Sequence, residues 1–330
     1  MTRRIRPLPA ALVVVSLLFT AAALLARSQP ISNIPGLVLA VGSPYVPLGA
    51  LAGLVVAASC RQLLLSLLAA AVFAASLGVQ VSWYYLGGAV DVGAARDIRV
   101  LSSNLRYGEA DPTYIVNLAE ESADVITVAE LTPEAVHRFE QSGIESAFPY
   151  SHLIPLPGAG GVGLWSRYPL DNLSELQQPG VSMPAAQLQV PGLRFQPVLA
   201  SVHVYSPVAG EINTVGEWRS GMRSAKAQLD NLAATAGPGA VIVGGDFNST
   251  PDLRQFRDLL TDGYRDAVEQ SGSGFAPTFP SDAWFPPVIT IDHVVTRNAS
   301  AESVRTIKVP GSDHRALLAT IRVPVDPTAS

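Results

Sequence analysis

The chain has 330 residues, which is enough for one large domain and a further segment. All 27 acidic residues lie after residue 90, but five of the 22 Lys and Arg residues lie before it, so residues 91–330 carry a net charge of −10. An acidic domain lacks the basic footprint that a tight, sequence-independent grip on DNA requires; this argues against a nuclease but does not exclude one, because bound divalent cations change the local field.

The N-terminal part of the chain contains three long stretches without a charged residue, 7–26, 28–60 and 62–90. Roughly 20 helical residues cross ~30 Å of hydrocarbon, and a charge at its centre would cost ~3 kcal/mol on insertion scales. The sequence therefore predicts a membrane anchor over residues 1–88, with the lipid bilayer as its partner. Its three transmembrane helices are expected near residues 8–27, 34–58 and 63–86.

Arginine residues predict the orientation of this anchor. Arg3, Arg4 and Arg6 precede the first helix and Arg61 lies in the second loop, so both segments are expected on the cytoplasmic side of the cell membrane. Only Arg27 falls on the other side. A multi-pass anchor with three crossings then places the rest of the chain outside the cytoplasm.

Two alternatives to this topology stay open. Pro44 and Pro47 fall in the middle of the second stretch and fit a kinked or re-entrant helix. If that segment does not cross the membrane, the domain lies on the inner side. Residues 1–30 also fit a cleaved signal peptide, in which case the two later segments still anchor the protein.

After a short linker, residues 89–96, strand-like and helix-like segments alternate through a domain at 97–323, and a tail follows at 324–330. Strands are expected at 97–104, 123–131, 161–166, 185–190, 195–205, 240–244, 288–296 and 317–323. Helices are expected at 112–122, 132–143, 217–235 and 252–260. Because several strands between 161 and 205 follow one another without a helix, the pattern favours a pair of mixed or largely antiparallel sheets with helices outside.

The segment Gly244–Asp252 (GGDFNSTPD) is the most specific chemical motif. Two glycines allow a tight turn after a buried strand, and Asp246 and Asn248, at i and i+2, then point to the same side of an extended segment. A carboxylate there can accept a proton or orient water, and an amide can donate to a phosphoryl oxygen. The alternative is a helix-entry turn in which both side chains only bond backbone amides.

Two further polar side chains lie at strand ends. Glu130 follows the apolar run Val125–Ala129, where carboxylate oxygen suits a hard divalent cation, and Asn104 ends the first strand. Taken alone, a solvated acid at Glu130 and a turn former at Asn104 are the simpler interpretations.

Asp292-His293 and Asp313-His314 are two Asp-His pairs near the C-terminus. Phosphoryl transfer needs charge at the non-bridging oxygens and a positioned group for the water or the leaving group, and a histidine held by a carboxylate supplies one. Because neighbours in a strand alternate faces, we expect His293 to be structural if Asp292 faces the site, and His314 to carry the chemistry. His203 also lies in a strand, where a lone histidine is more often a packed residue.

Together these segments resemble the endonuclease/exonuclease/phosphatase superfamily, which includes deoxyribonucleases, abasic-site endonucleases, inositol-polyphosphate 5-phosphatases and bacterial sphingomyelinases. The resemblance covers about residues 97–323 and rests on SSNLRYG, VITVAEL, SVHVYSP, GDFN, IDH and SDH in the family's order. It implies an α+β fold, a four-layer α/β/β/α sandwich of two mixed sheets flanked by helices, with the site at one rim.

The resemblance also implies a metal side of this site. Glu130 corresponds to the primary metal ligand, with Asn104 and Asp313 nearby. The implied cofactor is Mg²⁺, with Mn²⁺ as an alternative, which would polarise the phosphoryl oxygen and stabilise the leaving oxygen.

The phosphate side is implied in the same way. Asp246 and Asn248 orient the nucleophilic water and the phosphoryl group, and His314, oriented by Asp292, contacts and neutralises the phosphate. His203 is the second histidine on this side. The deoxyribonuclease branch partners that histidine with a glutamate, and the matching region, Gly161–Tyr168, contains no acid, which counts against a strictly nuclease-like role.

A membrane-anchored, outward-facing member resembles an actinobacterial branch linked to glycopeptide resistance. That resemblance implies a lipid-linked phosphate or pyrophosphate as substrate, and no specific nucleic acid. The aromatic residues of Ala283–Val288 (AWFPPV) fit contact with acyl or prenyl chains, or packing within their loop. The sequence thus predicts a membrane-anchored, Mg²⁺-dependent phosphoesterase; the alternatives are an extracytoplasmic metal-dependent nuclease and a non-catalytic binding module on the same fold.

Overall fold

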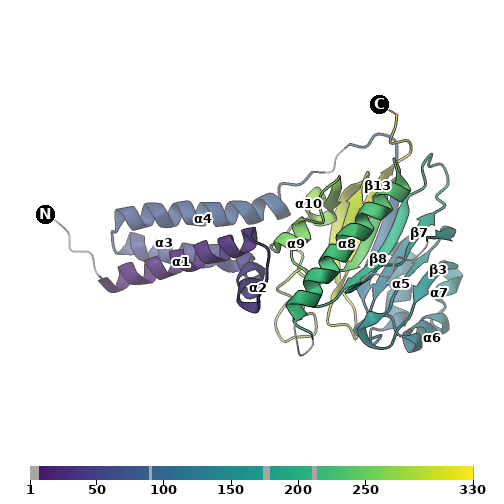
Figure 1. Cartoon of the computed structure of the whole chain (residues 1–330), viewed down its shortest axis with the longest axis horizontal. Helices are drawn as coiled ribbons and strands as arrows, with labels where there is room; N and C mark the ends of the chain where they lie inside the picture. The colour runs from purple at the N-terminus through teal and green to yellow at the C-terminus, as the bar shows by residue number, and fades with distance from the viewer. Residues whose placement is uncertain (1–6, 89–90, 174–178, 210–213, 330) are drawn as a thin grey trace. The chain divides into compact units, whose positions relative to one another are not determined.

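A computed structural model describes residues 7–88, 91–173, 179–209 and 214–329 of the chain. These residues form two compact units, one of Met1–Trp83 with Pro251–Arg257 and the other of Tyr84–Thr250 with Asp258–Ser330. The first unit is helical, and the second contains both β-sheets (Figure 1).

The helical unit consists of apolar segments. Its elements are α1 (Pro7–Ser28), α2 (Ile34–Val41), the 3₁₀ turn η1 (Ser43–Tyr45), α3 (Val46–Ser59), α4 (Leu63–Tyr84) and the one-turn α9 (Arg254–Arg257). Among the described residues, only α1 and α4 are, as single helices, long and apolar enough to cross a membrane, whereas α2 and the segment that follows it meet at a bend of 44°. Single helices thus form the first and third stretches, and the second is broken, which agrees with the kinked or re-entrant alternative that its prolines left open. It breaks at Gly42 and Pro44, because glycine weakens a helix and proline lacks the N–H that continues one.

A buried charge inside the helical unit is paired. Arg27, in the last turn of α1, donates from Nε to Oδ1 of Asp252 at 2.8 Å, and the Gln80 amide near the end of α4 donates to the same oxygen at 3.1 Å. Asp252 is only 1% exposed. The ends of α1 and α4 therefore lie at the same end of this unit, and the two helices run in the same direction.

The first sheet of the other unit has six strands in the order β12-β13-β1-β2-β4-β3. Their bounds are β1 Ala95–Asn104, β2 Val125–Ala129, β3 Tyr150–Ile154, β4 Val162–Ser166, β12 Ser300–Lys308 and β13 Arg315–Pro324. β1 and β2 pair in parallel, and the other neighbours pair antiparallel. The parallel pairing brings the carboxyl ends of β1 and β2 to one edge of the sheet.

The second sheet has seven strands in the order β10-β11-β9-β8-β7-β5, with β6 paired to β8. Their bounds are β5 Leu170–Asn172, β6 Val181–Ser182, β7 Ala185–Leu188, β8 Val198–Val204, β9 Val241–Asp246, β10 Tyr264–Asp266 and β11 Asp292–Arg297. β8 and β9 form its parallel pair, so their carboxyl ends also meet at one edge.

Helices cover both outer faces. α5 (Pro112–Ser122) and α6 (Pro133–Gln141) share an apolar cluster with Leu101, Ile126 and Trp165 of the first sheet. α8 (Thr214–Ala236) packs against β8 and buries Trp218 (Figure 1). The inner faces meet, since Ser201 of β8 donates to the carbonyl of Val128 in β2 at 2.9 Å. Two mixed sheets flanked by helices are thus confirmed. Shorter elements are α7 (Ile144–Ala147), η2 (Gly158–Gly160) and α10 (Ala267–Ser271).

Differences from the predicted elements are local. The helix expected at 252–260 is wrong beyond the single turn α9, and the edge strands β3 and β12 were not predicted. β1 begins at Ala95, inside the range expected for the linker, and β13 reaches Pro324, the first residue of the predicted tail. The linker residues 89–90 and the three arginines at positions 3, 4 and 6 lie outside the described residues.

Candidate active site

Two polar side chains meet where the parallel strands β1 and β2 end. Asn104, the last residue of β1, donates from Nδ2 to Oε1 of Glu130 at 3.1 Å and to Oδ2 of Asp246 at 3.0 Å. Glu130 follows β2 directly, and Asp246 is the last residue of β9. The amide of Asn104 therefore connects an acid of the first sheet to an acid of the second.

The loop after β1 fixes Asn104 and Glu130 through its backbone. The N–H of Arg106 donates to Asn104 Oδ1 at 2.8 Å, and the N–H of Tyr107 donates to Glu130 Oε2 at 2.7 Å. The φ angles of Arg106, Tyr107 and Glu130 are 48°, 52° and 58°, a left-handed conformation that costs roughly 1–3 kcal/mol at such residues. Strain of this kind persists only where the surroundings hold it, and it concentrates at functional sites.

The GDFN segment follows β9 in the second sheet. Gly245 has φ 154° and lies against the carbonyl of Val202, where a Cβ would not fit. Oδ1 of Asp246 accepts from the N–H of Asn248 at 2.7 Å, and Nδ2 of Asn248 donates to the Val204 carbonyl at 2.9 Å. Asn248 is also left-handed, with φ 47°. Both predicted side chains are therefore held on the same side of the loop.

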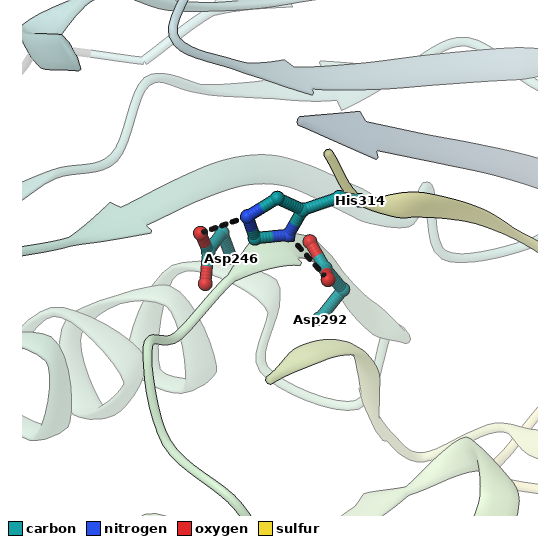
Figure 2. Close-up of side chains that lie close together, drawn as sticks. All are labelled: Asp246, Asp292 and His314. Atoms are coloured by element: carbon teal, nitrogen blue, oxygen red, sulfur yellow. Dashed lines mark hydrogen bonds and ion pairs between the residues drawn. The ribbon is translucent and has the colours of Figure 1, made fainter. Parts of the chain in front are cut away.

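An imidazole lies between two carboxylates. Asp292, the first residue of β11, is paired in register with Asp246, and its Oδ2 lies 2.8 Å from Nδ1 of His314. The other ring nitrogen of His314, Nε2, lies 3.9 Å from Oδ2 of Asp246. Figure 2 shows the ring of His314 with one carboxylate on each side. All three residues are buried.

The environment shifts two pKa values in this cluster. Burial, reinforced by the Asp292 carboxylate, raises the pKa of Asp246 to about 6. Burial lowers the pKa of His314, but the negative charges of Asp292 and Asp246 outweigh this and raise the pKa to about 10. At neutral pH His314 is therefore an imidazolium held by Asp292, and the site still carries more acids than cations.

His203 approaches the acids from β8. Its Nε2 lies 3.8 Å from Oδ2 of Asp246 and 3.9 Å from Oε1 of Glu130. Its Nδ1 lies 2.7 Å from the carbonyl oxygen of Ala159. A carbonyl only accepts, so Nδ1 carries a hydrogen and Nε2 faces the acids. The acid that the sequence lacks as a partner of His203 is thus replaced by a backbone carbonyl.

The SDH segment connects the two halves of the site. Ser312 is buried; its hydroxyl donates to the carbonyl of Asn104 at 2.8 Å and accepts from the N–H of His314 at 3.0 Å. Burial raises the pKa of Asp313, with the positive charge of His314 opposing it. The negative charge of Glu130 adds to this rise, so Asp313 lies within electrostatic reach of Glu130.

The donor set fits a hard divalent cation. Ligand atoms of Asp246, Asp292 and His314 lie within 4.8 Å of one another, and because His314 is an imidazolium, the carboxylates are the donors to a cation in this cluster. Glu130 and Asn104 add further donors at the same rim, and oxygen-rich sites of this kind suit Mg²⁺. A bound dication would also offset the excess negative charge. The predicted ligands Glu130, Asn104 and Asp313 differ from the cluster of two acids and one histidine, so the ligand assignment stays a prediction.

The structure brings the predicted site residues to one rim of the sandwich. Direct contacts connect Asn104, Glu130, His203, Asp246, Asn248, Asp292 and His314, and Asp313 adjoins them. Sequence reasoning missed Ser312 and the backbone groups of Tyr107 and Ala159. The SDH motif contains Ser312, but no side-chain pattern indicates a backbone partner.

Comparison with known proteins identifies the chain. Two mixed sheets flanked by helices, with acids and imidazoles at one rim, are typical of a family of phosphodiester hydrolases. Residues 101–314 match the Endonuclease/Exonuclease/phosphatase family, and the chain belongs to this family, whose members are hydrolases that act on phosphodiester bonds. The match extends from β1 to His314 and so includes all the predicted site residues. None of the curated proteins matches the chain.

Solved structures share the fold. A family protein from Bacteroides thetaiotaomicron is 12% identical with a TM-score of 0.54, over 70% of this chain and 99% of that one. Truncated TDP2 from Caenorhabditis elegans is 13% identical with a TM-score of 0.53, over 68% and 97%. TDP2 from D. rerio, in complex with a single-strand DNA product, is 18% identical with a TM-score of 0.53, over 68% and 98%. These identities establish a common fold alone.

Proposed function

We propose that the chain is a membrane-anchored, Mg²⁺-dependent phosphoesterase that hydrolyses a lipid-linked phosphate ester or pyrophosphate outside the cytoplasm. The observation that carries this proposal is the convergence of Asp246, Asp292 and His314 beside Glu130. Three acids, Asp246, Asp292 and Glu130, surround one imidazolium, so the site has an excess of negative charge. Mg²⁺ bound there would balance this charge and would allow an anionic phosphate substrate to bind.

The residues act on the reaction in distinct ways. His314, charged and held by Asp292, donates from Nε2 to a phosphoryl oxygen, and Asn248 donates from its side-chain amide. Asp246, whose pKa is near 6, accepts the proton of the attacking water. Glu130 and Asn104 would hold Mg²⁺, which would supply positive charge at the phosphoryl and leaving oxygens.

An exposed aromatic tip supports the lipid-linked substrate. Trp284 is 96% exposed and Phe285 is 37% exposed, with ring centroids 5.4 Å apart. Their loop is fixed to the site, because the N–H of Ser281 donates to the carbonyl of Asp313 at 2.6 Å. An exposed tryptophan beside a phosphate site suits contact with an apolar chain.

The direction of the helices supports three crossings. Arg27 and Gln80 bind the same carboxyl, so α1 and α4 run in the same direction. Two parallel spans require the chain to return across the membrane between them, and only the bent α2–α3 segment is available for this. With the arginines at positions 3, 4 and 6 on the cytoplasmic side, the chain leaves α4 outside the cytoplasm.

The test uses the full chain purified in detergent, with Mg²⁺, on prenyl phosphate, prenyl pyrophosphate, sphingomyelin, inositol phosphates and plasmid DNA. We expect hydrolysis of a lipid-linked phosphate, its loss with EDTA, and its loss in Glu130→Ala and Asp246→Ala. Glu302→Ala, an exposed acid in β12, is the control and keeps full activity. Full activity in both site variants overturns the assignment, and digestion of DNA alone favours the nuclease. A C-terminal reporter fusion tests the topology.

A further inference from the structure

His293 is a buried polar residue that the proposed chemistry does not use. It is 1% exposed and follows Asp292 in β11, so it points to the opposite face of the strand, away from the site, as the sequence predicts. Its Nδ1 lies 2.7 Å from Oδ2 of Asp266, and its Nε2 lies 2.9 Å from the carbonyl oxygen of Ser249. The second contact reaches the catalytic loop, residues 246–250.

The catalytic loop is held from behind. Asp246 and Asn248 face the site, whereas Phe247 and Ser249, both 0% exposed, pack on the other side. The ring of Phe247 lies edge-on to His293, with centroids 5.8 Å apart. The hydroxyl of Ser249 accepts from Trp218 Nε1 at 2.9 Å. Ser249 is thus fixed through its hydroxyl and, by His293, through its carbonyl.

The ring of His293 is itself oriented by a fixed carboxylate. Asp266 is 1% exposed, and its Oδ1 accepts from the backbone N–H groups of Val268 and Glu269 at 2.8 and 3.2 Å. Its Oδ2 is therefore directed at His293. This connection leads from the start of α10 through Asp266 and His293 to the peptide between Ser249 and Thr250.

We propose that His293 and Asp266 are positioning residues for Asn248, an inference that rests on the proposed function. Asn248 has a left-handed backbone, φ 47°, which the neighbouring peptides must hold in place. The hydrogen bond from His293 to the adjacent residue, Ser249, supplies that hold. A displacement of Asn248 by about 1 Å costs about 10²-fold in rate, even though the substituted residue, His293, does not touch the substrate.

The test compares His293→Phe with His293→Gln in the full chain. Phenylalanine keeps the ring contact with Phe247 but donates no hydrogen bond, whereas glutamine can still donate to Ser249. We expect a 10- to 100-fold lower kcat for His293→Phe and a smaller loss for His293→Gln. The KM and the Mg²⁺ concentration for half-maximal activity remain unchanged, because the metal-side residues are not touched.

Tyr264→Phe is the matched control. It removes another buried hydrogen bond, from the Tyr264 hydroxyl to the Leu229 carbonyl at 2.7 Å, which lies two residues from Asp266 and does not involve the catalytic loop. We expect a similar fall in Tm and an unchanged kcat. An equal fall in kcat in Tyr264→Phe reduces the role of His293 to general stability and overturns the inference.

A double-mutant cycle separates positioning from stability. Because His293 acts through Asn248, His293→Phe has no further effect on kcat in an Asn248→Ala background; additive losses overturn the inference. If His293→Phe does not fold, His293→Gln and Asp266→Asn carry the same cycle. A wild-type chain that hydrolyses no phosphate substrate overturns the proposed function instead, whereas an active wild type with unaffected variants overturns only this inference.

Discussion

The two units of the chain both bury an aspartate, with opposite consequences. In the helical unit Asp252 is 1% exposed and its charge is balanced by Arg27 at 2.8 Å. In the sandwich unit Asp246 is also 1% exposed, but its neighbours include Asp292 and Glu130, with His314 as the charged partner. The charges of Arg27 and Asp252 cancel, whereas the second cluster keeps an excess of negative charge. The first is therefore a structural ion pair, and the second is a candidate cation site.

The largest effect is expected when the unbalanced cluster loses its orienting acid. Asp292→Asn removes the carboxylate that holds Nδ1 of His314. We expect kcat to fall roughly 10²- to 10³-fold, because the imidazole loses both its orientation and the partner that keeps it charged. Steady-state kinetics with the proposed lipid-linked substrate measure this. A loss below threefold would show that His314 does not depend on Asp292.

Disrupting the Arg27–Asp252 pair should lower the unfolding free energy without changing the catalytic rate. Asp252→Asn leaves Arg27 without its carboxylate and is expected to lower the unfolding free energy by about 3 kcal/mol. Replacing both partners, Arg27→Met with Asp252→Leu, should recover most of that loss, because an apolar pair needs no compensation. Thermal unfolding of the full chain in detergent tests this. No recovery in the double variant contradicts the comparison.

Replacing Asp246 should raise the unfolding free energy of the metal-free protein, whereas replacing Asp252 lowers it. The folded pKa of Asp246, about 6, is above the ordinary value of 3.8, so the protonated form stabilises the fold at low pH. This stability is complete below pH 4 and is lost as the pH rises through 6. In EDTA at pH 8, Asp246→Asn should therefore be more stable than the wild type by roughly 1–3 kcal/mol. The difference in unfolding free energy between the variant and the wild type should disappear at pH 4. If urea titrations give the same difference at both pH values, the pKa of Asp246 is not raised.

The last prediction concerns the cation itself. Mg²⁺ at 100 times its dissociation constant should stabilise the wild type by about 2.7 kcal/mol, because it binds only the folded acid cluster. Asp246→Asn should respond less, and Asp252→Asn should respond as the wild type does. Differential scanning fluorimetry with and without Mg²⁺ gives the comparison. Equal shifts in all three proteins would place the cation elsewhere.

The sequence predicts the strands whose apolar runs lead into the site but not the outer strands. β2 (VITVA) and β9 (VIVGGD) are buried throughout, and their runs of apolar residues predict buried strands. β12 (SAESVRTIK) and β3 (YSHLI) lie at sheet edges with several exposed positions, so polar residues interrupt the pattern. The predicted helix at 252–260 failed because its start belongs to the helical unit, a constraint that no local pattern expresses.

The site was predictable in its side chains but not in what holds them. The motifs indicated Glu130, Asp246 and His314, because acids and imidazoles directly after buried strands cost free energy unless a partner or a metal ion compensates them. The sequence does not indicate that the carbonyl of Ala159 orients His203, because every residue carries the same backbone groups. The left-handed turn at Arg106 and Tyr107 was also hidden, because glycine marks such turns and these residues do not.

The position of β13 bears on how the protein is made. This strand begins directly after His314 and pairs with β1, near the middle of the first sheet, so β1 gains this neighbour only after residues 315–324 have been synthesised. During synthesis Glu130 and Asp246 have emerged long before His314. A chain that ends before residue 314 therefore lacks both His314 and this neighbour of β1, and a variant truncated there should be without the proposed activity.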